Sequence, residues 1–152
     1  MKITIAAVGR LRSGPAKTLF DDYTKRLKWP VTLREVGNGR GSSAAERLRN
    51  ETKALAGAIP KGATVVGLDE AGDQLSSRKF AARLEQWRDG GVKELAFVIG
   101  GADGLAAEIT ADAARMIALG PQTWPHFLVR AMLAEQLYRA YTILTGHPYH
   151  RE

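Results

Sequence analysis

Short apolar runs alternate with amphipathic stretches along the whole chain, and this alternation limits the possible folds more than any other feature. The expected strands are 2–8, 31–36, 63–69, 94–100 and 116–119. Apolar residues at helical spacing and serine caps predict helices at about 15–28, 43–59, 77–87, 105–115 and 125–145. Apolar strands separated by helices are typical of parallel sheets that are covered on both faces. We therefore expect an α/β fold with a mostly parallel sheet, in one domain spanning residues 1–152.

Composition excludes several classes of function. The 152 residues contain no cysteine, which removes disulfides, thiolate nucleophiles and cysteine-based zinc sites and fits a reducing cytosol. The first strand-like run is too short for a signal peptide, and nothing later in the chain approaches a membrane span. We expect a soluble, cytoplasmic protein. The net charge of +6 fits a polyanionic partner such as a nucleic acid, but a solvated basic surface explains the charge equally well.

Three strand ends are candidates for a ligand site, because ligands of such sheets bind beyond the carboxyl ends of the strands. They are GLDEAGDQLSS (67–77), VIGGADGL (98–105) and ALGPQTWPH (118–126). The glycines of the second stretch do not match the GxGxxG fingerprint, and no GK[ST] follows, so neither a dinucleotide fold nor a P-loop is indicated. A tight turn that needs glycine remains the simpler interpretation there. The third stretch exposes backbone groups that suit a ligand such as adenine, or it is a connector.

Other chemistries are poorly supported. Asp69 follows a buried strand, but the acidic and lysine partners of a receiver domain are missing, so we interpret it as bonding to nearby amides. His147 and His150 are separated by Pro148, which prevents a helical turn, and no carboxylate joins them. We therefore expect no metal site. No G-x-S-x-G is present to indicate a serine hydrolase.

Four ordered stretches together resemble a known family. They are LDEAGDQLSSRKFA, FVIGGADGL, TWPHFLVRAMLAEQLYRAYTILTG and the terminal HPYHRE. The chain is similar to the small bacterial SPOUT-class methyltransferases of large-subunit rRNA, and more narrowly to the pseudouridine N3-methyltransferases of 23S rRNA. The likeness extends from AAVGR near the start to the last residue.

The resemblance implies a fold, a partner, a donor and a site. The C-terminal part of the sheet would thread a trefoil knot, the protein would be a homodimer, and S-adenosylmethionine would donate the methyl group. The implied substrate is a pseudouridine in 23S rRNA, in the context of the ribosome. The implied donor-binding residues are Leu68, Gly100, Leu119, Gly120, Pro121, Gln122, Thr123 and Trp124. The alternatives are a SPOUT methyltransferase for another RNA nucleotide and a non-catalytic, ribosome-associated RNA-binding module.

The last expected helix is apolar over much of its circumference. Phe127, Ala131, Ala134, Tyr138 and Tyr141 recur on one side, and several leucines widen the surface. Such a helix is either central to the core of one chain or shared with a partner. The resemblance favours a dimer face, on which Tyr138 and the neighbouring Leu137 would lie.

The terminal HPYHRE (147–152) places reactive side chains where chains are usually disordered. Gly146 can end the helix and Pro148 prevents its continuation, so the segment leaves in a set direction. Tyr149 can stack on a base, Arg151 can pair with a phosphate, and His147 or His150 can exchange a proton. Our hypothesis is that Tyr149, His150 and Arg151 are catalytic, beside the donor pocket of the partner subunit; the alternative is a loose polar end.

Overall fold

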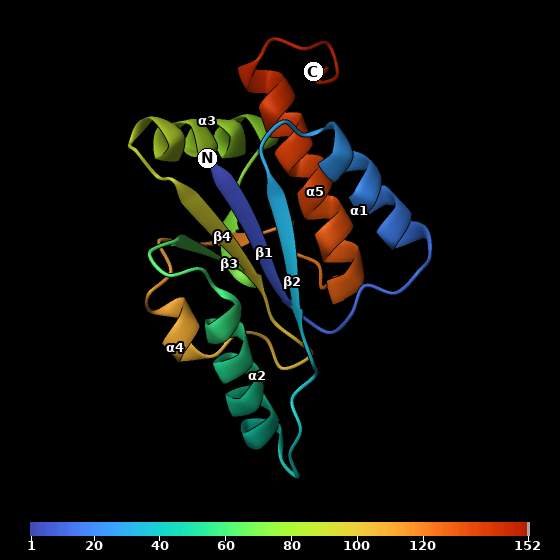
Figure 1. Ribbon diagram of the computed structural model, residues 1–152, viewed down its shortest axis with the longest axis vertical. Helices are drawn as coiled ribbons and strands as arrows, with labels where there is room; N and C mark the ends of the chain where they lie inside the picture. Colours follow the sequence, from blue (N-terminus) through green and yellow to red (C-terminus); the bar gives the residue numbers. More distant parts are fainter. Residues whose placement is uncertain (152) are drawn as a thin grey trace.

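The computed structural model describes residues 1–151, which form a five-stranded sheet flanked by helices (Figure 1). The strands are β1 (Lys2–Val8), β2 (Val31–Val36), β3 (Thr64–Gln74), β4 (Glu94–Ile99) and β5 (Arg115–Ala118). Their order is β2-β1-β4-β3-β5, and every neighbouring pair is parallel. The expected parallel sheet is confirmed.

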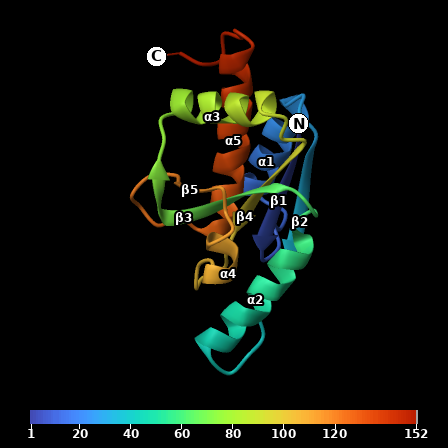
Figure 2. The same cartoon turned by 90° about the vertical axis from the view of Figure 1, so that its left-hand side faces the viewer.

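Helices cover both faces of this sheet (Figures 1 and 2). They are α1 (Pro15–Arg26), α2 (Ala44–Ala58), α3 (Ser77–Asp89), α4 (Ala107–Thr110) and α5 (His126–Leu144). Helices α1, α3 and α5 pack on one face, and α2 and α4 pack on the other. The helix caps follow from the sequence, since the Ser43 side chain accepts from the Glu46 amide at 3.1 Å and Ser76 accepts from Lys79 at 3.3 Å.

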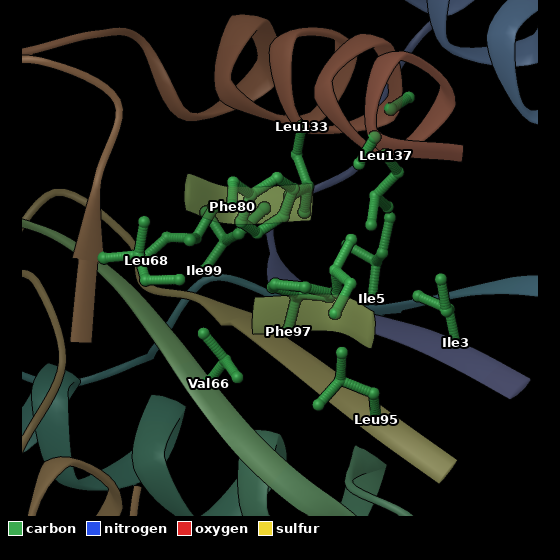
Figure 3. Packing of buried hydrophobic residues seen from close by; sticks show 14 of the residues in the cluster. Ile3, Ile5, Val66, Leu68, Phe80, Leu95, Phe97, Ile99, Leu133 and Leu137 are labelled. Carbon is green, nitrogen blue, oxygen red and sulfur yellow. The ribbon is translucent and has the colours of Figure 1, made fainter. Parts of the chain in front are cut away.

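The strands divide their side chains between two apolar clusters, as period-2 alternation requires. In β1, Ile3 and Ile5 point to the α5 face, whereas Ala6 and Val8 point to the α2 face. Figure 3 shows side chains of α5 above those of β1, β3 and β4. Leu137 of α5 is fully buried there.

This burial corrects one expectation about α5. Leu137 and Tyr138 are 0% and 8% exposed within the single chain, so they belong to its own core and not to a contact with a second copy. The helix is apolar over much of its circumference because it lies between α1 and α3 and over the sheet. The large apolar side chains of α1 and α5 that remain exposed are Leu19 and Phe127.

Two elements differ from their expected lengths. Strand β3 continues through polar residues to Gln74, because Ile117 of β5 pairs first with Leu68 and then, after an irregularity, with Asp73. A Cβ at Gly72 would lie 2.6 Å from the Ile117 backbone, so only glycine permits this approach. Helix α4 has four residues, not eleven, because the Ala114 amide already donates to Val65 of β3 and draws the chain into the sheet.

None of the helices in residues 1–151 is long and apolar enough to cross a membrane. The trefoil knot concerns the path of the whole chain and stays a prediction.

Candidate functional site

A cavity of about 490 Å³ lies at the carboxyl edge of the sheet, where β4 and β5 end beside residues 68–70 of β3. Its volume is within the usual range for pockets that bind small molecules. Its lining residues are Leu68, Asp69, Glu70, Ile99, Gly100, Gly101, Ala102, Asp103, Gly104, Ile117, Leu119, Gly120, Gln122, Thr123, Trp124, His126 and Val129. The three strand ends that the sequence singled out therefore surround one cavity.

One wall of the cavity is the tight turn 100–104 after β4. The Gly104 amide donates to the Gly101 carbonyl at 3.2 Å, and the two residues form an isolated antiparallel bridge. A Cβ at Gly100 would lie 2.2 Å from the Gly104 oxygen. Gly100 is thus required by the turn itself. A valine there would distort the turn as well as narrow the cavity.

The opposite wall is the loop 119–124 after β5. Its shape is fixed by two hydrogen bonds: the Trp124 indole donates to the Leu119 carbonyl at 3.2 Å, and the Thr123 hydroxyl donates to Glu70 at 2.6 Å. Gly120 has a φ of 108°, a conformation that favours glycine. The loop is held against β3 and presents backbone groups to the cavity.

Seven of the eight residues assigned to donor binding from the sequence line this cavity. They are Leu68, Gly100, Leu119, Gly120, Gln122, Thr123 and Trp124. Pro121 lies in the same loop, is exposed and does not line the cavity. We therefore expect Pro121 to affect the shape of the loop and not to contact a ligand.

Two residues at the start of α5 were missed from the sequence. His126 lines the cavity, and partial burial, followed by the nearby Arg130 charge, lowers its imidazole pKa below the ordinary value. A lowered pKa disfavours the charged form, so His126 is neutral at pH 7. It presents an uncharged donor and acceptor to a ligand. The signal was a histidine and an arginine four residues apart in the apolar first two turns of the helix.

Arg130 joins α5 to the ends of the first two strands. Its side chain is 0% exposed. It donates to Glu35 at 2.9 Å and to the carbonyls of Gly9, at 3.0 Å, and Val8. The Glu35 carboxylate also accepts from the Leu11 amide at 2.5 Å. This network fixes the start of α5, and with it His126, relative to the sheet.

Glu51 of α2 lies beneath the glycine turn. The residue is only 7% exposed, and its carboxylate accepts from the Gly39 amide at 2.8 Å. A Cβ at Gly101 would lie 2.7 Å from the other carboxylate oxygen, so the turn rests directly on this side chain. Helix α2 and the loop before it are therefore in contact with the cavity wall.

Residues 147–151 of the HPYHRE segment follow the C-terminal end of α5, whereas His126 at its other end lines the cavity (Figure 1). Helix α5 has 19 residues, which separates its two ends by about 28 Å at 1.5 Å per residue. Gly146 has a φ of 67°, and the His147 amide closes the helix by donating to Thr142 at 2.9 Å. Within one chain, the segment does not reach the cavity.

The segment is nevertheless packed in place and is not a loose end. The Tyr149 hydroxyl contacts Glu135 at 3.0 Å and Tyr23 at 3.2 Å, and its ring lies 4.8 Å from that of Tyr138. Burial, then these two hydrogen bonds, raises the pKa of Tyr149 above its ordinary value. His150 contacts Arg139 at 3.3 Å between Nδ1 and Nη1.

The end of the segment is more exposed than Tyr149 and His150. Arg151 is exposed, and Glu152 lies outside the described residues. Tyr149, His150 and Arg151 therefore lie together, as the sequence predicted, but on a different surface from the cavity.

Comparison with known proteins identifies the family. A family model described as "Predicted SPOUT methyltransferase" matches residues 1–150. The chain belongs to the SPOUT methyltransferase family. A curated relative from Rhodospirillum centenum, named "Ribosomal RNA large subunit methyltransferase H", is 54% identical over 151 residues, covering 99% of each chain. A relative of the same name from Paracoccus denitrificans is 51% identical and covers 100% of each chain.

Solved structures support the fold of this SPOUT methyltransferase. A probable methylase family protein from Haemophilus influenzae has a TM-score of 0.58 at 12% identity, covering 99% of this chain and 70% of its own. A probable methyltransferase from Bordetella pertussis has a TM-score of 0.53 at 15% identity, covering 91% and 95%. In the part of the chain that the structure describes, no group of three or more acidic, histidine or cysteine residues is placed to hold a metal ion.

The Arg130 network of this SPOUT methyltransferase predicts a large stability effect. Replacing Arg130 with Met leaves the Gly9 carbonyl and Glu35 without their buried donor, so we expect a loss of about 3 kcal/mol in the free energy of unfolding. Urea denaturation followed by circular dichroism measures it. Exposed Arg12→Met is the matched control and should change stability by less than about 0.5 kcal/mol. Equal stabilities of the two variants would contradict a structural role for Arg130.

Proposed function

We propose that this protein transfers a methyl group from S-adenosylmethionine to N3 of a pseudouridine in 23S ribosomal RNA. It would act in the cytoplasm, as one domain over residues 1–152 and in the context of the ribosome. The observation that carries the proposal is the cavity at three strand ends, lined by seven of the residues that the family resemblance assigns to the donor. The curated relatives are named as methyltransferases of the large ribosomal subunit's RNA, at up to 54% identity over nearly their full lengths.

The walls of the cavity fit a nucleoside-sized donor. Three of the five residues in the turn 100–104 are glycines, which leave backbone atoms uncovered, and the loop 119–124 lines the cavity together with Leu68. Such a mixture of apolar walls and fixed backbone groups can recognise an adenine ring. S-adenosylmethionine supplies a methyl group that is already activated on sulfur. The chain's main task is then to hold the acceptor in line with it.

The acceptor nitrogen must lose its proton before or during transfer. Its acidity lies within reach of a modest base or a nearby cation. We assign the removal of this proton to the HPYHRE segment, in which His150 can accept it. In the same segment, Arg151 can bind a phosphate and Tyr149 can stack on a base. His126 is the histidine of the same chain at the cavity, and it is the competing proton acceptor.

The distance along α5 supports a homodimer. Because about 28 Å separates the segment from the cavity of its own chain, a joint site requires a second copy. A groove of about 750 Å³ lies along the exposed side of α5 and includes apolar side chains that a single chain leaves partly open. Among its lining residues are Leu19, Leu75, Leu128, Met132 and Gln136. We assign this groove to the contact with the second copy.

Mass mapping of rRNA nucleosides in cells lacking the gene tests the function. We expect loss of a single methylated pseudouridine from 23S rRNA and its return when the gene is restored. Loss of a different methylated nucleoside would replace the proposed acceptor with another RNA base. An unchanged profile would favour a non-catalytic RNA-binding module, which would also show no affinity for S-adenosylmethionine.

Donor binding predicts a thermal shift. At a concentration 100 times its Kd, S-adenosylmethionine should stabilise the native state by about 2.7 kcal/mol and raise the melting temperature by about 5 °C or more. Ala102→Trp should abolish the shift, because Ala102 is exposed on the cavity wall and a large ring there fills the space. Ala102→Ser, which keeps the size, should retain it. Absence of a shift in the wild-type protein at millimolar ligand would reject this donor site.

A further inference from the structure

We propose that the loop 37–43 and helix α2, here called the basic arm, together with the loop 9–14 form the surface that binds the phosphate backbone of the RNA. This rests on the proposed function, because it assigns the RNA substrate of that function to a particular face. Neither the donor cavity nor the HPYHRE segment includes any part of this surface.

Positive charge is concentrated on these segments. Their cationic residues are Arg10, Arg12, Arg40, Arg47, Arg49 and Lys53. The carboxylates within the same segments are Glu46 and Glu51; Glu51 is buried, and Glu46 is partly exposed but hydrogen-bonded within the loop. Glu46 accepts from the Ser42 amide at 2.9 Å and from its hydroxyl at 3.1 Å, and Glu51 is buried beneath the glycine turn. These segments carry six cations and two carboxylates, a net charge of +4, and one of the two carboxylates is buried.

Most of these cations have no ion-pair partner among the described residues. Within residues 1–151, Arg47 is the only one of the six in an ion pair, a long 4.0 Å contact with Asp103. The closer ion pairs lie elsewhere, as in Lys17–Asp21, Arg26–Asp22 and Arg88–Glu85. Guanidinium groups without a carboxylate partner are suited to pairing with phosphate oxygens. The basic arm thus keeps its charge available for an external anion.

The basic arm is placed beside the cavity. In Figures 1 and 2, α2 and the loop before it project beyond the carboxyl edge of the sheet, the edge at which the cavity opens. Two contacts attach α2 to the glycine turn: Arg47 with Asp103, and Glu51 beneath Gly101. The loop 9–14 joins the same surface, since the Gly9 amide donates to Val36 at the end of β2. An RNA strand held here would pass the mouth of the cavity.

The loop 37–43 is also held firmly enough to present its arginine. The Arg40 carbonyl accepts from the Asn50 side chain at 2.6 Å, and a Cβ at Gly39 would lie 2.2 Å from the Arg47 carbonyl oxygen. The loop backbone is therefore packed directly on α2, and the exposed Arg40 side chain extends from a fixed base. Such fixation lowers the entropy that is lost when a phosphate is bound.

A triple variant, Arg40→Ala with Arg49→Ala and Lys53→Ala, tests the assignment. All three side chains are exposed, so the fold should be retained. We expect affinity for a 23S rRNA transcript to fall by about tenfold or more. The slope of log affinity against log salt should become shallower by about two, at about 0.7 per lost contact for unpaired RNA. Filter binding over a salt series measures both.

The matched control removes the same charge from the opposite edge of the sheet. Lys2, Lys61 and Lys93 are exposed and lie at or just before the starts of β1, β3 and β4. Their combined replacement with Ala should leave the salt slope nearly unchanged. Equal losses in both triple variants would show a general effect of net charge and overturn the proposal, as would an unchanged slope in the basic-arm variant.

The S-adenosylmethionine thermal shift separates this proposal from the proposed function. The basic-arm variant should keep the wild-type shift, because none of its three residues lines the cavity. Loss of the shift would make the arm a structural support of the donor site and would overturn its assignment to RNA. A wild-type protein that binds RNA through the arm but never shifts with the donor would instead reject the donor site alone.

Discussion

Deletion of Tyr149 to Glu152 should lower methyl transfer by about 100-fold or more, while the donor-induced thermal shift is retained. The deletion removes the stacking, cationic and titratable groups of the HPYHRE segment. It leaves the donor cavity unchanged, because none of the segment's described residues, 147–151, lines that cavity. Single-turnover methylation of 23S rRNA with saturating donor measures the loss.

The deletion also removes a structural contact, so single substitutions are needed beside it. Tyr149 packs on Tyr138 and hydrogen-bonds to Glu135, so its loss should lower stability by about 1–2 kcal/mol. Arg151→Ala changes an exposed side chain, and His150→Ala changes a half-buried side chain that forms a hydrogen bond with Arg139. We expect the first to weaken RNA binding and the second to slow the turnover of bound RNA.

The outcomes are distinguishable. Wild-type turnover in both single variants and in the deletion would make the segment an ordinary chain end. Unfolding of the deletion, with normal turnover in both single variants, would make its role structural. A wild-type pH profile in His150→Ala, combined with a changed profile in His126→Gln, would transfer the proton acceptor to the cavity wall.

Local sequence features predicted the strands and caps well, because each depends on nearby residues. The apolar run 2–8 alternates between two clusters wherever it is placed, and Ser43 meets an amide three residues away. The polar half of β3 could not be found in this way. Residues 69–74 form a strand only because β5 lies beside them, and that neighbour is more than forty residues distant.

The same difference between local features and contacts of distant segments applies to the candidate site. The cavity walls follow strand ends, so a list of strands and glycines was enough to indicate most of them. Arg130 and Glu51 escaped notice because each contacts a distant part of the chain: Arg130 donates to the Gly9 carbonyl, and Glu51 packs against Gly101. Burial gives these charges their importance, and sequence alone does not reveal which charges are buried.

Mixing two inactive variants should restore methyl transfer if the site is shared between subunits. One variant, Ala102→Trp, has a filled cavity and an intact segment. The other, His150→Ala with Arg151→Ala, has an intact cavity and a defective segment. In a mixed dimer, one site combines the intact cavity of one subunit with the intact segment of the other. Random exchange should therefore recover about one quarter of the wild-type rate, since half of the dimers are mixed and each has one working site.

The control is the chain that carries all three substitutions. Mixed with either parent, it forms dimers in which no intact cavity meets an intact segment of the partner, so no activity should return. Exchange is verified by two affinity tags and sequential pull-down of the mixed dimer. Mixed dimers that form but stay inactive would contradict a site built from two chains. Because the 19-residue helix α5, about 28 Å long, lies between the segment and the cavity of its own chain, that result would exclude the HPYHRE segment from the chemistry at either cavity and leave His126 as the histidine at the site.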